Sequence, residues 1–115
     1  MKTILLAAIV LASAAFAQDA TGNADNGKRI FMKNGCFECH GTVGQGTIAG
    51  ARIGPPPLNV QGVIRYVRRP AGQMPAFTEK VMSDQELTDV YTYLKTIPAA
   101  KPAKDIPLLS DLRAK

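Results

Sequence analysis

The sequence predicts an all-α domain of short helices joined by long loops. Residues 60–69 and 83–94 carry apolar side chains at helical spacing, and the second segment opens with the helix-capping sequence Ser83-Asp84-Gln85-Glu86. No segment shows a clear alternation of apolar and polar residues of the kind found in strands. A length of 115 residues favours one domain and argues against two.

Residues 1–17 have the pattern of a secretory signal peptide. Lys2 gives a positive start, residues 4–17 are almost wholly apolar, and Ala15-Phe16-Ala17 places small residues where a signal peptidase cuts. This apolar stretch is too short for a membrane-spanning helix, which needs about 20 residues. A retained membrane anchor is the alternative. We expect cleavage after Ala17, export to the periplasm and no stable membrane anchor.

The predicted domain covers residues 18–98 and begins with a helix. Asp25 is the expected cap of that helix, which runs through Met32 and ends at Asn34-Gly35. Residues 41–57 contain five Gly and three Pro without any helical or strand period, which indicates a loop. The helix over 60–69 must end before the proline that follows it, because a residue preceding proline avoids the helical conformation.

A loop over 71–82 leads to the clearest predicted helix, which Pro98 terminates. Four residues of this helix recur at helical spacing and form its expected apolar face: Leu87, Val90, Tyr91 and Leu94. The tail at 99–115 is rich in Pro, Ala and Lys, so we expect it to be extended. Three of its apolar residues can pack on the body: Ile106, Leu108 and Leu109.

The composition excludes several functional classes. Fourteen Lys and Arg against nine Asp and Glu give a net charge of +5, but the charges are scattered, so no nucleic-acid partner is expected. Two Cys and one His cannot complete a structural zinc site, which takes four ligands. Phosphate-binding glycine motifs and the serine-hydrolase motif are missing. With no Trp and a mature length of about 100 residues, the chain buries only a marginal core and needs a bound group inside it.

The motif that carries the chemistry is Cys36-Phe37-Glu38-Cys39-His40, a C-x-x-C-H sequence. Its two thiols can each form a thioether with a haem vinyl group, and the adjacent histidine can bind the iron. A thioredoxin-like pair would need a βα context, and a zinc half-site lacks its second pair of ligands. A plain disulfide explains neither His40 nor the small core. The motif therefore predicts one covalently bound haem c per chain.

With this motif the mature chain resembles the class I c-type cytochromes over nearly all its length. Gly27 and Phe31 match the packing pair of the family's first helix, and Val90, Tyr93 and Leu94 match its last helix. The resemblance implies a cytochrome c-like fold of three to four short helices wrapped around one covalently bound haem. It also implies electron transfer and no enzymatic activity. A finer likeness is to the cytochrome subunits of periplasmic dehydrogenases, and the missing Trp and the long tail are departures from the family.

The resemblance implies two further residues of the haem site. Gly54-Pro55-Pro56-Pro57-Leu58 resembles the family's Gly-Pro-x-Leu sequence, in which the proline carbonyl accepts a hydrogen bond from the histidine ligand. Pro55 or Pro56 is the expected partner of His40. Residues 73–77 resemble the family's Met-Pro ligand loop, which makes Met74 the second axial ligand.

Residue chemistry alone leaves three methionines of the mature chain as candidates for that ligand. A thioether favours Fe(II), and Met32, Met74 and Met82 each carry one. Met32 lies four residues before Cys36 on the same predicted helix, and Met82 abuts the cap of the last helix. Met74 precedes Pro75, whose fixed φ can hold the loop and the sulfur in place. Each methionine could instead fill the core.

We therefore expect a periplasmic one-electron carrier between a dehydrogenase donor and an oxidase or cytochrome acceptor. The positive charges of three lysines could steer a partner that carries an acidic docking patch: Lys28, Lys33 and Lys80. A group of four residues could pair with the haem propionates: Arg65, Tyr66, Arg68 and Arg69. The alternatives are a haem subunit fixed to one dehydrogenase, docked through the tail, and a haem sensor or enzyme with an open iron site.

Overall fold

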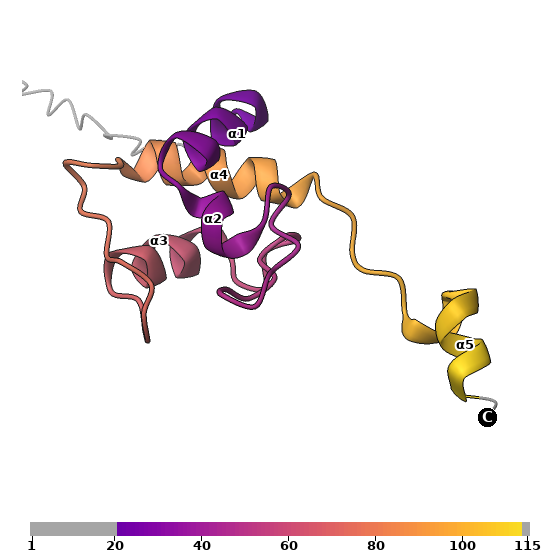
Figure 1. Cartoon of the computed structure of the whole chain (residues 1–115). Helices are drawn as coiled ribbons and strands as arrows, with labels where there is room; N and C mark the ends of the chain where they lie inside the picture. Colours follow the sequence, from indigo (N-terminus) through magenta and orange to yellow (C-terminus); the bar gives the residue numbers. More distant parts are fainter. Residues whose placement is uncertain (1–20, 114–115) are drawn as a thin grey trace, which may run out of the picture.

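A computed structural model describes residues 21–113, so the predicted signal peptide lies outside the described residues. The described residues form helices and no strand, which confirms the all-α class. No helix among them combines the length and the apolar character that crossing a membrane requires. The elements are, in chain order, α1 (Ala24–Lys33), α2 (Cys36–His40), α3 (Val60–Arg68), α4 (Asp84–Lys95), η1 (Ala103–Asp105) and α5 (Pro107–Arg113) (Figure 1).

The N-terminal caps follow the sequence at α4 and differ from the prediction at α1. At α4 the Glu86 N–H donates to the Ser83 hydroxyl at 3.1 Å, and the Ser83 N–H donates to the Glu86 carboxylate at 2.8 Å. This is the predicted capping box. At α1 the cap is Asn23, which accepts from the Asn26 N–H at 2.9 Å. Asp25 lies in the first turn instead, where its negative charge still favours the helix.

The core lies where α1 crosses α4, and α3 packs against α4 beside this crossing (Figure 1). The rings of Phe31 and Tyr93 meet at the crossing with their centroids 5.7 Å apart. Tyr91, which the periodicity placed on the apolar face, is only half-buried and lies under the Lys95 ammonium. The buried apolar residues are Ile30, Phe31, Ile64, Met82, Leu87, Val90, Tyr93 and Leu94.

A buried carboxylate joins the two crossed helices. Asp89 of α4 is 5% exposed and accepts hydrogen bonds from the Asn23 N–H at 2.8 Å and the Asn26 amide at 2.7 Å, both from the start of α1. The Gln85 amide adds a third bond at 3.0 Å. Burial by itself raises the pKa of Asp89, but the three hydrogen bonds outweigh it, and the pKa lies below its usual value.

Asp89→Asn should therefore destabilise the protein in a pH-dependent way. Because the folded-state pKa is below the unfolded value of about 3.9, the carboxylate contributes stability above about pH 4 and loses it as the pH falls through the folded pKa. We expect a loss of roughly 1.5–3 kcal/mol at pH 7. Denaturant unfolding at pH 7 and pH 3 measures it. A difference between variant and wild type that stays constant down to pH 3 would contradict the assignment.

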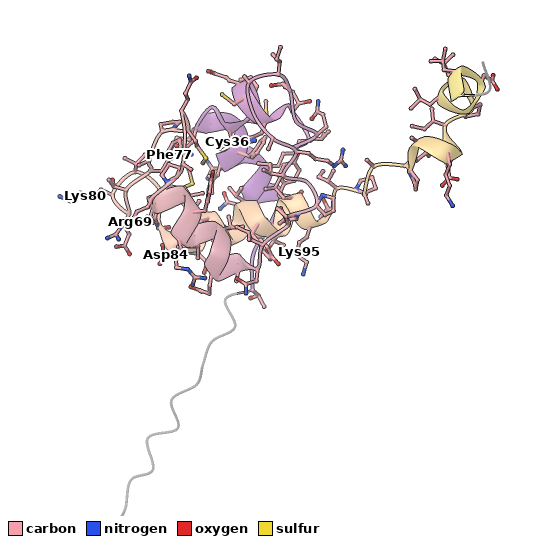
Figure 2. The ribbon with its side chains drawn as sticks, turned by 90° about the horizontal axis from the view of Figure 1, so that it is seen from below. Cys36, Arg69, Phe77, Lys80, Asp84 and Lys95 are labelled. Atoms are coloured by element: carbon pink, nitrogen blue, oxygen red, sulfur yellow. The ribbon has the colours of Figure 1, made fainter. Side chains whose placement is uncertain are left out.

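The sequence predicts an extended tail, but the tail contains the helices η1 and α5. Pro107 stands at the first position of α5, where a proline is tolerated because its missing N–H would have no helical partner. Within residues 21–113, α5 packs against η1 and no other helix, and the tail leaves the body in both views (Figures 1 and 2). Leu108 and Leu109 are exposed, so their expected packing on the body is wrong, whereas Ile106 is half-buried.

Candidate functional site

The C-x-x-C-H residues form a single helical turn, α2 (Cys36–His40), bounded by two glycines. Gly35 has φ of +74° and Gly41 has φ of +78°, a conformation that other residues adopt only with strain. Residues three and four positions apart in a helix share one side. The turn therefore presents the side chains of Cys36, Cys39 and His40 on the same side.

Both cysteines are free thiols. Cys36 is half-buried against the core and Cys39 is exposed, and no disulfide joins them. Burial raises the pKa of the Cys36 thiol against a weaker opposing effect of a backbone hydrogen bond. A thioredoxin-like pair depends on a lowered thiol pKa, so the direction at Cys36 argues against that interpretation. Two free sulfurs on one turn remain available for thioether bonds.

The His40 ring is held by the backbone of the following loop. Its Nδ1 lies 2.7 Å from the carbonyl oxygen of Ala51. Since a carbonyl can only accept, Nδ1 carries the proton and Nε2 keeps the free lone pair that a metal ligand needs. The partner corrects the expectation from the family resemblance, which had placed Pro55 or Pro56 there.

The path of the loop explains why Ala51 is the acceptor. The Gly46 N–H donates to the His40 carbonyl at 2.8 Å, which folds the loop back on α2. The chain then reverses in a turn closed by the Thr47 N–H, which donates to the Gly50 carbonyl at 2.9 Å. This turn ends at Ala51, beside the histidine. A backbone carbonyl carries no side-chain signal, so the sequence could not identify this partner.

The surroundings of the turn fit an apolar prosthetic group. Cys36, Ile53, Val67 and Phe77 come from four different segments and pack against the core, yet each remains only half-buried. Two free thiols, an imidazole with a free Nε2 and uncovered apolar side chains are the donor set and lining that a covalently bound haem requires.

The three candidate methionines occupy different environments. Met82 is 1% exposed and belongs to the core. Met32 lies on α1 and is 37% exposed. Met74 is half-buried in the loop between α3 and α4. The burial of Met82 agrees with a packing role. Met74 has no position in the core, so its sulfur is not already used for packing there.

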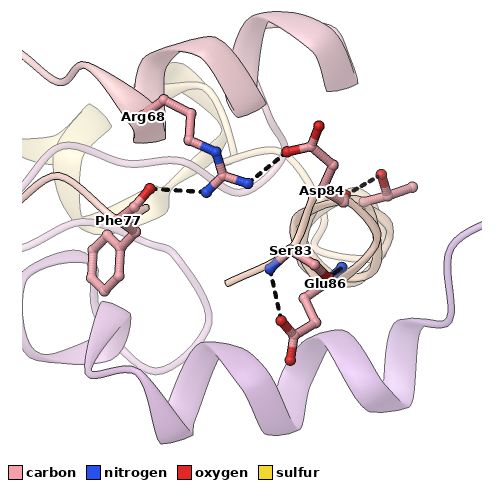
Figure 3. A network of polar contacts seen from close by, with 6 residues as sticks. Arg68, Phe77, Ser83, Asp84 and Glu86 are labelled. Atoms are coloured by element: carbon pink, nitrogen blue, oxygen red, sulfur yellow. Dashed lines mark hydrogen bonds and ion pairs between the residues drawn. The ribbon is translucent and has the colours of Figure 1, made fainter. Parts of the chain in front are cut away.

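A network of polar contacts anchors the loop three residues beyond Met74 (Figure 3). The Phe77 N–H donates to the Val67 carbonyl at 3.1 Å, and the Arg68 guanidinium donates to the Phe77 carbonyl at 2.9 Å. The same guanidinium pairs with Asp84 at 2.5 Å. Sequence reasoning had considered Arg68 only as a partner for a propionate. The other three candidates for that role are exposed: Arg65, Tyr66 and Arg69.

Comparisons with known proteins identify relatives over most of the chain. Residues 22–94 match the model of a family described as cytochrome C oxidase, cbb3-type, subunit III. The chain is also similar to cytochrome c-555 of Methylococcus capsulatus (strain ATCC 33009 / NCIMB 11132 / Bath), with 29% identity over 114 residues that cover 90% of this chain and 93% of the relative. No protein of solved structure matches the chain.

Proposed function

Since this chain belongs to the family described as cytochrome C oxidase, cbb3-type, subunit III, and is a small c-type cytochrome, we propose that it is a periplasmic one-electron carrier. Cytochromes of this kind transfer electrons and are not enzymes. We further propose that one haem c is bound covalently through Cys36 and Cys39, with His40 and Met74 as its axial ligands. The haem would supply the redox chemistry by alternating between Fe(II) and Fe(III).

The observation that supports this proposal most strongly is the hydrogen bond at His40. The bond from Nδ1 to Ala51 holds the ring in one orientation and leaves Nε2 as the electron-pair donor. Both thiols stand on the same helical turn as this ring. A histidine with a structural role alone would not require two unpaired cysteines at these positions.

Met74 distinguishes a carrier from an enzyme or sensor. With protein ligands on both sides, the iron would have no free position for oxygen or a substrate. The loop of Met74 is anchored at Phe77, which favours a fixed sulfur over a mobile side chain. We therefore favour the closed-site carrier over the alternative of an open-site haem protein.

The proposed partners are redox proteins, a dehydrogenase as donor and an oxidase or another cytochrome as acceptor. Lys28, Lys33 and Lys80 are exposed and can steer a partner with an acidic docking patch. A second candidate function is that of a haem subunit fixed to one dehydrogenase. The exposed leucines of α5, at 71% for Leu108 and 63% for Leu112, favour this candidate. A fixed subunit would co-purify with dehydrogenase activity, whereas a free carrier would separate from it.

Intact mass spectrometry under denaturing conditions tests the proposal in one measurement. The periplasmic protein should have the mass of a chain beginning at Gln18 plus one haem, because thioethers survive denaturation. Cys36→Ser and Cys39→Ser should each yield little folded holoprotein, whereas Glu38→Gln, a change at an exposed position of the same motif, should keep the haem. Haem that leaves the native protein in acidified organic solvent would contradict covalent attachment. A chain that retains Met1 would contradict cleavage after Ala17.

A further inference from the structure

Arg68 ties together three segments around the loop that carries Met74 (Figure 3). It lies on α3, and one nitrogen of its guanidinium donates to the Phe77 carbonyl in the middle of the loop at 2.9 Å. Another nitrogen donates to the carboxylate of Asp84, the first residue of α4, at 2.5 Å. The planar, forked guanidinium suits this double role, which a single ammonium group fills less well.

Phe77 is the point at which the loop is fixed to α3. Its carbonyl accepts from Arg68, and its N–H donates to the carbonyl of the neighbouring Val67 at 3.1 Å. Both backbone polar groups of Phe77 are thereby satisfied by α3. The aromatic ring adds to the anchor because it packs against the core.

The segment that contains Met74 has no hydrogen-bonded anchor of its own. Within residues 21–113, no hydrogen bond reaches residues 70–76. Pro75 stiffens the chain next to Met74 but forms no bond to the rest of the molecule. The position of the Met74 sulfur is therefore set by the end of α3 on one side and by the Phe77 anchor on the other.

The two contacts of Arg68 differ in environment. The Arg68 side chain is 20% exposed, whereas that of Asp84 is 58% exposed. Ion pairs with exposed carboxylates contribute little, because water screens them. The hydrogen bond to the part-buried Phe77 carbonyl is the stronger constraint, since its loss would leave that carbonyl without a donor.

We propose that Arg68 is a positioning residue that keeps the Met74 sulfur at the haem iron. The inference rests on the proposed function, in which Met74 is the second axial ligand. Without the guanidinium, Phe77 would keep only its hydrogen bond to Val67 and its ring contact with the core. The loop would then move more, and the thioether would leave the iron more often. An external ligand then gains access to the iron faster, although the haem remains attached through α2.

The experiment compares Arg68→Leu with Arg29→Leu in the holoprotein. Both variants lose one positive charge, but Arg29 is exposed and its guanidinium donates only to the Asn26 side chain of its own helix, α1. The readouts are the rate of cyanide binding to the oxidised protein and the near-infrared sulfur-to-iron band, both far below the unfolding temperature. A charge-assisted bond of this kind predicts cyanide binding about tenfold or more faster in Arg68→Leu, and a weaker band. Arg29→Leu should match wild type, and Asp84→Asn should change the rate by less than about threefold.

The outcomes test the assignment of Met74 as ligand separately from the positioning role of Arg68. Wild-type protein that lacks the near-infrared band would overturn Met74 as ligand, whatever Arg68 does. If wild type shows the band, Met74→Ala removes it and the two arginine variants bind cyanide equally fast, the role of Arg68 is wrong while the proposed function stands. Should Arg68→Leu give no folded holoprotein, the milder pair Arg68→Gln and Arg29→Gln decides in the same way. A lower unfolding temperature with an unchanged cyanide rate would reduce Arg68 to a structural role and overturn the inference.

Discussion

Replacing Met74 by Ala is expected to abolish the near-infrared sulfur-to-iron band of the oxidised protein and to lower its reduction potential. A thioether stabilises Fe(II) relative to Fe(III), so its loss should favour the oxidised state. Axial ligands control a range of about 0.8 V, and a decrease on the order of 100 mV lies well within it. Each 59 mV changes the one-electron equilibrium by a factor of about ten. Optical spectra and a redox titration measure both effects.

The same change should open the iron to external ligands. Reduced wild-type protein should resist carbon monoxide at neutral pH, and Met74→Ala should bind it readily. Met82→Leu is the control, because Met82 is 1% exposed within the core and a Leu of similar volume should cost less than about 1.5 kcal/mol of stability. It should leave the band and the potential unchanged. Prompt binding of carbon monoxide by wild type would favour the open-site sensor or enzyme instead.

If Met82→Leu removed the band while Met74→Ala kept it, the ligand would be the buried methionine. The fold would then have to place the core position of Met82 at the iron, although the structure packs it among Leu87, Val90 and the other core residues. The pair of variants therefore tests the assignment of the ligand separately from the assignment of the fold.

The parts of the fold that local chemistry determines were predictable from the sequence. The capping box at Ser83 and the spacing of the apolar residues after it give α4 with its correct start. Local patterns were less reliable where two residues compete for one role. The helical period selected Tyr91 for the core, but Tyr93 is the buried ring, and only the family resemblance pointed to it. Asn23 and Asp25 are both good cap residues, and Asn23, which is the observed cap, also donates one tertiary hydrogen bond to Asp89.

Within the candidate site, side-chain motifs were readable and backbone partners were not. The C-x-x-C-H sequence identifies the turn of α2 without any structure. The carbonyls of Ala51 and Phe77 give no sequence signal, because every residue carries one and only the path of the loop decides which carbonyl faces His40 or Arg68. The helix α5 was missed because a tail rich in Pro, Ala and Lys was expected to be extended, although a proline at the first position of a helix is favourable.

At Gly27 the backbone of α1 lies close against the backbone of α4. A Cβ atom added at Gly27 would stand 1.9 Å from the backbone oxygen of Asp89 and 2.8 Å from the backbone nitrogen of Val90. Backbone atoms inside a helix cannot turn aside as a flexible side chain can. The two helices would have to move apart, which would loosen the hydrogen bonds of Asp89 to Asn23 and Asn26 as well.

Gly27→Ala is therefore expected to destabilise the holoprotein by about 3 kcal/mol or more, the upper end for overpacked cores. Helix propensity alone predicts the opposite, because Ala in a helix is favoured over Gly by up to about 1 kcal/mol. In a domain of this size the loss corresponds to a decrease of roughly 10–20 °C in the unfolding midpoint, measured by circular dichroism.

Gly62→Ala in α3 separates the two effects, since the same substitution there meets nothing nearer than the Leu58 side chain at 3.1 Å. At Gly62 the nearest atoms, at 3.1 and 3.2 Å, need to give way by only a few tenths of an ångström, so the propensity gain and a mild repulsion should nearly cancel, within about 1 kcal/mol. A Gly27→Ala protein as stable as Gly62→Ala would mean that α1 and α4 do not cross at backbone contact. A large loss confined to Gly27→Ala would instead establish that the crossing, with the Phe31 and Tyr93 rings packed at a tilt beside it, fixes the scaffold on which α2 presents its two thiols and His40.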